Sequence, residues 1–534
     1  MERTLSFSTR RWALAVAALL LSLAPPSQAE QHAVVVCPAE WQPLLGEWLA
    51  LRRTPWRRVT VLAPADTAEA MASVLVKAAG NPPPRWIVLI GDCPADGPAD
   101  PARNCPTWTR PAPCGQKWGG QAELVTDHPY TRLWPNAGHV AIARLPVDSP
   151  EELQSYLARV VAYERRSVAR HEDHRLTVVA SPGRFSPLVD RIIESTAASM
   201  LAGLTPPECG LHLTYADWRS VYCPFPPLAT DAVRRGLQTR SLAWLYLGHG
   251  RRDELDRLRT PLGSAVLLDR RSTTLLRGVE APTLAALVAC DAGAFDGPDD
   301  CLAEDLIRQP GGPLAALASS RVCMPYGNSV LGLELLDELF RGGATIGECV
   351  AAAKHRITSA AEPEQDTSSS TAVLRKTLER IAAGFVAEES ARQQERQEHV
   401  ELYNLLGDPM LTIRRPEAIE LAVAKLAADG RSIRIEGASP LAGRCRVSVR
   451  PPRGSVALRS GREELRLDSD SRDRFNKTYA AANRLAISEG EVDTPAGVFA
   501  IDLPIAEAVE GPLVAVAVVA GENGLAAGSI EVER

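Results

Sequence analysis

Residues 242–250 read Leu242-Ala243-Trp244-Leu245-Tyr246-Leu247-Gly248-His249-Gly250, and residues 284–293 read Leu284-Ala285-Ala286-Leu287-Val288-Ala289-Cys290-Asp291-Ala292-Gly293. Both begin as near-continuous apolar runs, which are typical of strands buried on both faces of a parallel sheet. The first run leads into a histidine between two glycines and the second into a cysteine. Because the carboxyl ends of neighbouring parallel strands converge on one crevice, we expect His249 and Cys290 to lie close together.

Further apolar runs alternate with longer amphipathic stretches on both sides of these segments, which predicts an α/β fold. One group of runs covers residues 34–37, 59–63, 86–90 and 140–143, and a second covers 176–180, 242–247, 284–289 and 314–318. Beyond Pro416 the pattern changes to short alternating strands separated by Gly, Asn and Pro, which is typical of a β-sandwich. We therefore expect a first α/β subdomain over residues 30–170, a second over 171–415 and a β-sandwich over 416–534.

A helix start signal follows the first group of strands. Ser149 is a capping residue, Pro150 suits the first helical position, and Glu151 and Glu152 place negative charge in the first turn. An amphipathic helix is therefore predicted to continue from here to Tyr163.

Length and charge narrow the classes of function. The chain has 534 residues. Single cores stop growing at roughly 250–300 residues, so several domains are expected. The net charge is −6, and acidic and basic residues are mixed along the chain. Because no basic stripe is available to neutralise phosphates, nucleic acid is not expected as a partner.

The first 29 residues have the features of a secretory signal peptide. Three arginines precede an apolar run over residues 12–24, and small residues at 27–29 predict cleavage before Glu30. The run is shorter than the roughly 20 residues that span a bilayer, and no later run qualifies. We therefore expect export to the periplasm or secretion, without a membrane span in the mature chain.

The cysteine count points to at least one unpaired thiol. Eleven cysteines are an odd number, so an oxidising compartment would leave one of them without a partner in the chain. Cys105 with Cys114, and Cys209 with Cys223, are spaced so that each pair can close a surface loop. The alternative is that these residues are reduced and buried as small apolar side chains.

Cys290 and His249 together suit nucleophilic catalysis. The cysteine is predicted to be the nucleophile, and the histidine the acid and base that takes up and returns its proton. The amides of Gly250 and Cys290 are candidates for an oxyanion hole, because glycine lets backbone approach a substrate closely. Asp291 would raise the pKa of the thiol if it faced Cys290, and strand alternation is expected to point it away. The structural alternative is a buried cysteine and an ordinary Gly-His-Gly turn.

Several segments, in the same order along the chain, resemble the gingipain-type cysteine peptidases, peptidase family C25. They are Thr126-Asp127 with Tyr130, Ala143 to Val147, Tyr246 to Gly250, Val288 to Phe295, Leu302 to Glu304, Pro313 to Ser320, and Tyr403 to Pro409. The similarity extends over residues 33–415. It implies two caspase-like α/β subdomains followed by an immunoglobulin-like domain, and endopeptidase chemistry on protein or peptide substrates.

The resemblance also assigns residues. Cys290 matches the family's nucleophile and His249 its catalytic histidine. Asp190 is the best match to the acidic residue with which well-known members select Arg or Lys at P1, and its alternative role is to stabilise the first turn of a helix. The loop that carries the family's histidine-orienting acid reads Ser181-Pro182-Gly183-Arg184-Phe185 here, without an acidic residue.

Cofactors and specificity are less defined by the resemblance. Family members can bind structural calcium, but no ligand cluster in this sequence is specific enough to name, and no other cofactor is expected. Pro325 and Tyr326 stand near the position where arginine-specific members carry a tryptophan, so the P1 preference of this chain can differ. The alternative function is a binding or scaffold protein that keeps a gingipain-like fold without turnover.

Overall fold

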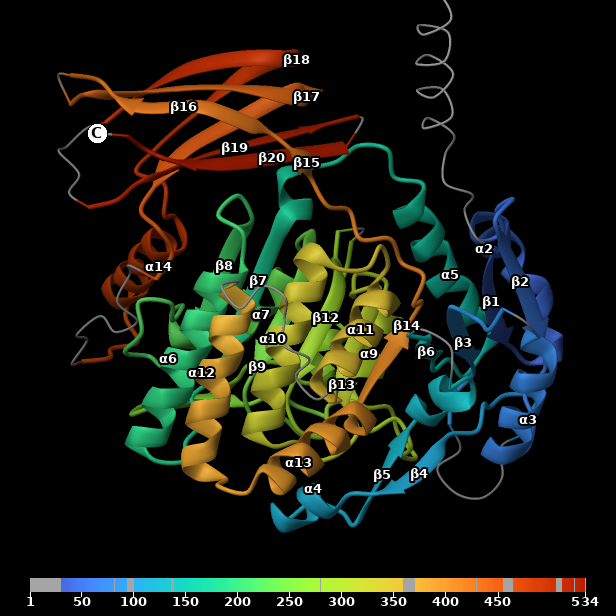
Figure 1. The fold of residues 1–534 in the computed structure, drawn as a ribbon. Helices are drawn as coiled ribbons and strands as arrows, with labels where there is room; N and C mark the ends of the chain where they lie inside the picture. Colours follow the sequence, from blue (N-terminus) through green and yellow to red (C-terminus); the bar gives the residue numbers. More distant parts are fainter. Residues whose placement is uncertain are drawn as a thin grey trace, which may run out of the picture.

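The computed structural model describes residues 30–534, except residues 81, 94–99, 136–138, 279, 359–369, 429, 455–463, 506–510, 523 and 534. The described elements form a large α/β unit with a smaller, mainly β unit at one end (Figure 1). The predicted signal peptide lies outside the described residues. Of the helices that are described, none combines the length and the apolar character that crossing a bilayer requires.

A ten-stranded sheet runs through the α/β unit. In spatial order its strands are β2 (Arg57–Leu62), β1 (Gln31–Val36), β3 (Trp86–Ile90), β6 (Ala141–Leu145), β14 (Tyr403–Gly407), β13 (Ala315–Ser319), β12 (Pro282–Val288), β9 (Ser241–Leu247), β7 (Arg175–Ala180) and β8 (Gly210–Tyr215). Neighbours are parallel from β2 to β6 and from β13 to β8, whereas β14 is antiparallel to β13. β14 also meets β6 through Leu406 and Arg144. The α/β class is confirmed, and both expected α/β units contribute to one continuous sheet.

Helices flank this sheet, and α10, α11 and α12 lie across the face seen in Figure 1. The helices are α2 (Gly46–Arg52), α3 (Ala68–Ala79), α4 (Pro113–Lys117), α5 (Pro150–Glu164), α6 (Pro187–Leu204), α7 (Ala229–Leu237), α8 (Arg270–Thr273), α9 (Leu302–Arg308), α10 (Pro325–Arg341), α11 (Ile346–Thr358), α12 (Ser370–Phe385) and α13 (Glu389–Leu402). Short 3-10 helices are η1 (Ala39–Leu45), η2 (His128–Leu133), η3 (His171–His174) and η4 (Pro226–Leu228), and two small hairpins pair β4 (Trp108–Pro111) with β5 (Glu123–Thr126) and β10 (Arg257–Thr260) with β11 (Gly263–Val266).

Helix α5 begins where the sequence predicts it. The Ser149 hydroxyl accepts a hydrogen bond from the Glu152 amide at 3.2 Å, and Pro150 follows the cap. The hydroxyl of Tyr156, on the buried face of the helix, donates to the carbonyl of Leu314 at 2.6 Å. The helix is thereby anchored beside the start of β13.

Strands β9 and β12 are neighbours near the centre of the sheet and are buried over almost their whole length. Burial on both faces explains why their sequences are continuous apolar runs instead of alternating ones. Their register pairs Leu247 with Val288. The prediction of two buried parallel strands at these positions is confirmed.

The C-terminal unit is built around a long hairpin of β17 (Ser432–Arg450) and β18 (Ser488–Pro504). β16 (Glu420–Leu426) pairs with the first part of β17 and β19 (Val514–Gly521) with its last part, and β20 (Gly524–Glu531) and β15 (Glu417–Ala418) follow β19. The pattern beyond Pro416 predicts short separate strands, but residues 432–435 and 445–449 lie in one strand. They are the two ends of β17, because a register shift between Ser439 and Ala442 lets one strand continue through the stretch between them.

Helix α14 (Ser469–Asn483), which lies between β17 and β18 in the chain, covers the edge of the main sheet. The side-chain oxygen of Asn483 accepts from the Leu213 amide at 2.7 Å, and its nitrogen donates to the Leu213 carbonyl at 3.0 Å. The Tyr479 hydroxyl lies 2.7 Å from Nε2 of His212. Asn483 therefore meets β8 as a neighbouring strand would, which protects this edge from pairing with another chain.

Candidate active site

Cys290 and His249 stand at matching positions beyond two paired strands. β12 ends at Val288 and β9 at Leu247, and these two residues are partners in the register, so each candidate lies two positions past the pair. The Gly248 amide donates to the carbonyl of Val288 at 3.2 Å and continues the ladder. The two loops therefore leave the same end of the sheet side by side.

Two glycines let the histidine loop pack closely on its neighbours, Gly250 on the cysteine loop and Gly248 on Ser181. A Cβ atom at Gly250 would stand 2.8 Å from the Cβ of Ala289 and 2.9 Å from the carbonyl oxygen of Cys290. A Cβ atom at Gly248 would collide with the side chain of Ser181. The backbones of Gly250 and Cys290, whose amides are the candidate oxyanion donors, are therefore in contact.

The imidazole of His249 is exposed and is held by the backbone of another loop. Its Nε2 lies 2.6 Å from the carbonyl oxygen of Gly183, and the His249 carbonyl accepts from the Tyr246 hydroxyl at 2.7 Å. With Nε2 protonated and donating to Gly183, Nδ1 is the nitrogen left to exchange a proton. A main-chain carbonyl thus contacts the histidine where the family resemblance implies an acidic side chain, and a carbonyl cannot be recognised from the sequence.

The loop that supplies this carbonyl, residues 181–186, is tied to the loop of the histidine. The Ser181 amide donates to the Leu247 carbonyl at 2.9 Å. Arg184, with a φ of 55°, forms an ion pair with Asp256 at 2.6 Å. These contacts hold the hydrogen-bond acceptor of the histidine at a fixed place beside β9.

Asp190 lies half-buried in the first turn of α6, close to the same loop. Its Oδ1 accepts from the Phe185 amide at 3.0 Å, and a Cβ atom at Gly183 would stand 3.0 Å from this oxygen. The contact is one that an aspartate at a helix start makes. Tyr326, at the start of α10, is half-buried and its hydroxyl donates to Glu379 of α12 at 2.6 Å.

Two exposed aromatic side chains extend from the histidine toward the first half of the chain. The ring of Phe185 lies 6.0 Å from that of His249, and the ring of Trp118 lies 6.3 Å from that of Phe185. About half of each aromatic residue is exposed, 45% for Phe185 and 55% for Trp118. No sequence signal marks them as site residues, because a tryptophan beside glycines has no motif of its own. They add an apolar surface next to the imidazole.

Cys290 is half-buried and has a second cysteine as its nearest polar neighbour. Its Sγ lies 3.7 Å from the Sγ of Cys323 and accepts from the Cys323 amide at 3.4 Å. Hydrogen bonding from Cys323 lowers the pKa of the Cys290 thiol, against the opposing effects of burial and of the charge on Asp291. Asp291 has a φ of 57°, so the strand alternation expected to point it away ends before this residue. Burial also raises the pKa of the Asp291 carboxyl.

A cavity of about 570 Å³ adjoins the cysteine loop. Its lining includes Arg251, Arg252, Asp291 and Arg321, together with Gly119 to Gln121, and it does not include Asp190. Arg321 is paired with Asp296, at 2.9 Å for Nη1. In the described part of the chain, Nε and Nη2 of Arg252 are buried without a hydrogen-bond partner. Neither Cys290 nor His249 lines this cavity, and its three arginines stand beside two aspartates.

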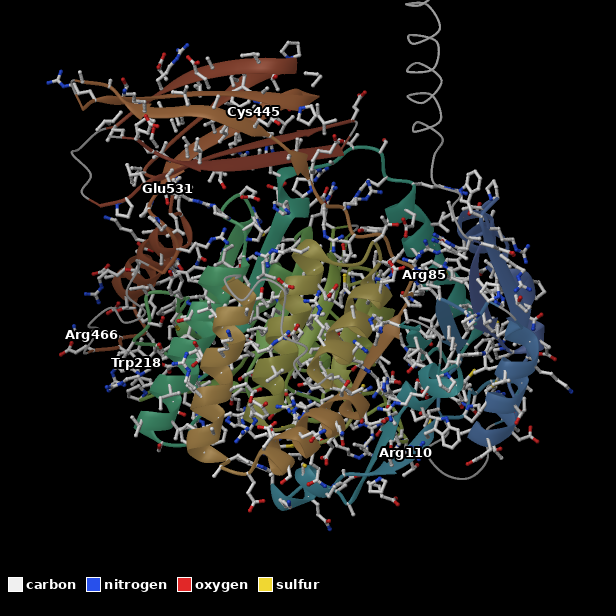
Figure 2. The ribbon with its side chains drawn as sticks, in the orientation of Figure 1. Arg85, Arg110, Trp218, Cys445, Arg466 and Glu531 are labelled. Carbon is white, nitrogen blue, oxygen red and sulfur yellow. The ribbon has the colours of Figure 1, made fainter. Side chains whose placement is uncertain are left out.

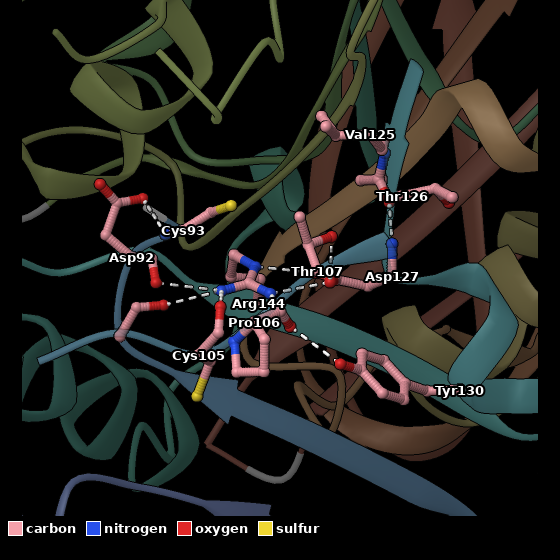
Figure 3. Close-up of polar contacts among 12 residues, drawn as sticks. Asp92, Cys93, Cys105, Pro106, Thr107, Val125, Thr126, Asp127, Tyr130 and Arg144 are labelled. Carbon is pink, nitrogen blue, oxygen red and sulfur yellow. Dashed lines mark hydrogen bonds and ion pairs between the residues drawn. The ribbon is translucent and has the colours of Figure 1, made fainter. Parts of the chain in front are cut away.

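The motif around Asp127 and Arg144 forms a closed network (Figure 3). Arg144 is fully buried, and its Nε and Nη2 donate to the two carboxylate oxygens of Asp127 at 2.9 and 2.8 Å. Its remaining donors reach main-chain carbonyls, among them that of Cys105 at 2.8 Å. The guanidinium also lies over the ring of Phe295 at 5.3 Å, and the Asp127 amide donates to Asn404 at 3.1 Å. The motif therefore contacts the segment that follows Cys290 through Phe295.

All eleven cysteines lie in the described residues, and none of them is in a disulfide. Ten are buried, including Cys445 in the C-terminal sheet (Figure 2), and Cys290 is half-buried. The disulfides that the spacing of Cys105 with Cys114 and of Cys209 with Cys223 allowed are not formed. Within the part of the chain that is described, no group of three or more His, Cys, Asp and Glu side chains is arranged to hold a metal ion.

Comparisons with known proteins agree with this architecture. The complex of the pro- and mature domains of RgpB from Porphyromonas gingivalis superposes with a TM-score of 0.51 at 14% identity, covering 94% of this chain and 100% of that one. A second solved structure, described as a protease, gives a TM-score of 0.50 at 14% identity, covering 94% and 97%. No curated protein matches the sequence. These structures share the fold.

The profile of peptidase family C25 matches residues 27–414, which include both α/β halves and every candidate site residue. The chain therefore belongs to peptidase family C25, the gingipain-type cysteine peptidases.

Proposed function

We propose that this chain is an exported cysteine endopeptidase in which Cys290 is the nucleophile and His249 the general acid and base. The observation that carries the proposal is the position of the two residues. A half-buried thiol with a lowered pKa and an exposed imidazole follow paired strands at the same register position. Membership of the family supports the same chemistry.

The chemistry follows from these side chains. The Cys290 thiolate attacks the carbonyl carbon of the scissile bond while Nδ1 of His249 holds the thiol proton. The amides of Gly250 and Cys290 donate to the developing oxyanion. The C–N bond then breaks, and the imidazolium gives its proton to the leaving amine. Water, deprotonated by the imidazole, attacks the acyl-enzyme and restores the thiolate.

In this mechanism Gly183 takes the positioning role of an acidic residue. Its carbonyl accepts a hydrogen bond from the Nε2–H group, so the neutral tautomer with a free Nδ1 is favoured. A neutral carbonyl stabilises the imidazolium less than a carboxylate does, because it supplies a dipole instead of a full charge. The histidine is therefore oriented even though the chain has no acid in that loop.

For the substrate we propose a protein or peptide with a basic residue at P1, bound by Asp190. The support is the half-buried carboxylate beside the loop that holds His249. For residues 1–29 we propose a signal peptide that directs the chain to the periplasm or the medium. Sequencing the mature amino terminus tests this, with Glu30 expected as the first residue.

For residues 416–534 we propose a variant of the immunoglobulin-like sandwich. The support is that β16 and β19 pair with opposite ends of β17. Each end of the long hairpin would then belong to a different sheet of the sandwich. An experimental structure with both ends of β17 in one flat sheet would contradict this arrangement.

The decisive experiment is digestion of a broad peptide library by the parent protein and by Cys290→Ala, with Cys301→Ser as the matched cysteine control. We expect cleavage by the parent and by the control and none by Cys290→Ala. Equal cleavage by Cys290→Ala would show that another residue is the nucleophile. A parent protein that binds peptides without cleaving any would instead indicate the alternative, a binding or scaffold protein.

A further inference from the structure

Cys323 is placed against the candidate nucleophile by the next strand of the sheet. It follows β13, the neighbour of β12, and precedes α10. Its amide donates to the Cys290 sulfur at 3.4 Å, and the two sulfurs are 3.7 Å apart. Cys323 is buried, whereas Cys290 reaches the surface. One thiol of the pair is therefore accessible and the other is shielded behind it.

A hydrogen-bonded chain orients the shielded thiol. The side-chain nitrogen of Asn328 donates to the Cys323 sulfur at 3.1 Å, and the Tyr403 hydroxyl donates to the Asn328 oxygen at 2.7 Å. The Tyr403 contact fixes the amide so that its nitrogen faces the sulfur. Peptide hydrolysis uses only the sulfur of Cys290. A second, oriented sulfur in contact with it has no part in that reaction.

We infer that Cys290 and Cys323 form a dithiol modification site, at which a hydroperoxide oxidises Cys290 and Cys323 then closes a disulfide. The loss of hydrolysis that this disulfide would cause rests on the proposed function, whereas the disulfide itself does not. The two cysteines differ in the way such a site requires. Hydrogen bonding lowers the pKa of the accessible thiol, and the same contact together with burial raises the pKa of Cys323.

The reaction balances with the hydroperoxide as the only oxidant. The Cys290 thiolate attacks the terminal oxygen, an S–O bond forms, the O–O bond breaks and an alcohol, or water from hydrogen peroxide, leaves. Cys323 then loses its proton to solvent and its sulfur attacks Cys290. The S–S bond forms, the S–O bond breaks and water leaves. Two thiols have lost two electrons, and one hydroperoxide has gained them.

The sulfurs need only a small displacement to react. A disulfide bond is about 2.05 Å long, so the pair must approach by about 1.7 Å from the observed 3.7 Å. Rotation of the two side chains can supply this movement. Closing the bond protects Cys290 from further oxidation to the sulfinic acid, which simple thiols cannot reverse.

The test is peptide mapping of the full chain after treatment with hydrogen peroxide. Trypsin releases Cys290 within residues 278–308, which also contain Cys301, and Cys323 within residues 322–341. We expect the two peptides to be linked, and fragmentation to place the bond at Cys290. Cys301→Ser should keep the link and Cys323→Ala should lose it. A sulfinic acid on Cys290 with Cys323 still a free thiol in the parent protein would overturn the inference.

A second measurement follows hydrolysis after peroxide and then dithiothreitol. The parent and Cys301→Ser should recover most of their activity, and Cys323→Ala should recover roughly tenfold less, because its Cys290 proceeds to the sulfinic acid. Equal recovery in all three would overturn the protective role of Cys323. If the protein hydrolyses no peptide, the proposed function fails, and the peptide map still decides whether the dithiol site exists. The map of the parent protein also decides if Cys323→Ala does not fold.

Discussion

The Arg144 network and the Cys290–His249 pair lie close to one another and differ in their burial and in the hydrogen-bond partners of their polar atoms. Arg144 is fully buried and is surrounded by a carboxylate and main-chain carbonyls, all from the protein. Cys290 is half-buried and His249 is exposed, and an open cavity adjoins the cysteine loop. Phe295 links the two regions, because its ring lies under the Arg144 guanidinium. A polar group near a strand end stabilises the fold when all its hydrogen-bond partners come from the protein, as for Arg144. Cys290 and His249 reach the surface instead, so a substrate can contact them.

The largest effect is expected when the closed network is broken. Arg144→Met leaves the buried Asp127 carboxylate unpaired, which should lower the free energy of unfolding by about 3–5 kcal/mol. Arg85→Met is the matched control, since Arg85 is 46% exposed in its pair with Glu348 and should change stability by about 0–1 kcal/mol. Urea titration measures both. Similar small losses in the two variants would refute the contrast between the closed network and an exposed ion pair.

Removing the imidazole should act on the rate and leave stability unchanged. His249→Ala is expected to lower kcat by about 10²–10⁴-fold, because the general acid and base is lost. Its unfolding midpoint should match that of the parent, since the side chain is exposed. His355→Ala, an exposed histidine elsewhere, controls for the substitution. An unchanged kcat in His249→Ala would remove this residue from the proposed mechanism.

Asp190→Asn separates substrate binding from loop support. The amide oxygen of asparagine can still accept from the Phe185 amide, so the loop contact is retained. If Asp190 binds a basic P1 residue, kcat/KM should fall roughly 10- to 150-fold for arginine peptides alone. This corresponds to a loss of about 1.5–3 kcal/mol in transition-state stabilisation. Peptides that differ only at P1 measure this. Equal losses for basic and neutral peptides would leave Asp190 with the loop-supporting role only.

The smallest expected effect is a shift in the pH at which Cys290 reacts. The thiolate is the reactive form, so alkylation should rise with pH through a midpoint below that of an ordinary cysteine, because hydrogen bonding from Cys323 lowers the pKa of Cys290. In Cys323→Ala the midpoint should move to higher pH. Iodoacetamide labelling with peptide mapping measures it, and Cys301→Ser serves as the control. A midpoint that stays in place would assign the lowered pKa to a cause other than Cys323.

Local patterns predicted the elements that carry the site. The apolar runs before His249 and Cys290 are the neighbouring strands β9 and β12, and Ser149 caps α5. Such signals depend on burial and on hydrogen bonds within a few residues, so they are readable in the chain. The β-sandwich pattern was read as separate short strands, whereas a register shift near Ser439 joins two of them into β17.

Contacts between segments far apart in the chain cannot be predicted from such local patterns. β14 joins the two halves of the main sheet although it lies more than 80 residues beyond β13 in the chain, and its pairing depends on neighbours that no local pattern identifies. The Gly183 carbonyl on His249 is a main-chain atom, present at every residue. Cys323 is a neighbour of Cys290 because β13 lies beside β12, and the sequence does not indicate this pairing.

Residue pattern and order alone predict that a histidine and a cysteine follow two buried parallel strands, that the chain resembles family C25 and that α/β units precede a β-rich one. Periodicity, glycines and residue order encode these features directly. The folded molecule was needed to identify the atoms that orient the histidine, the sulfur that lies against the nucleophile and the polar motif whose hydrogen-bond partners all come from the protein. These outcomes depend on distances between segments far apart in the chain, and such distances are set by packing as a whole.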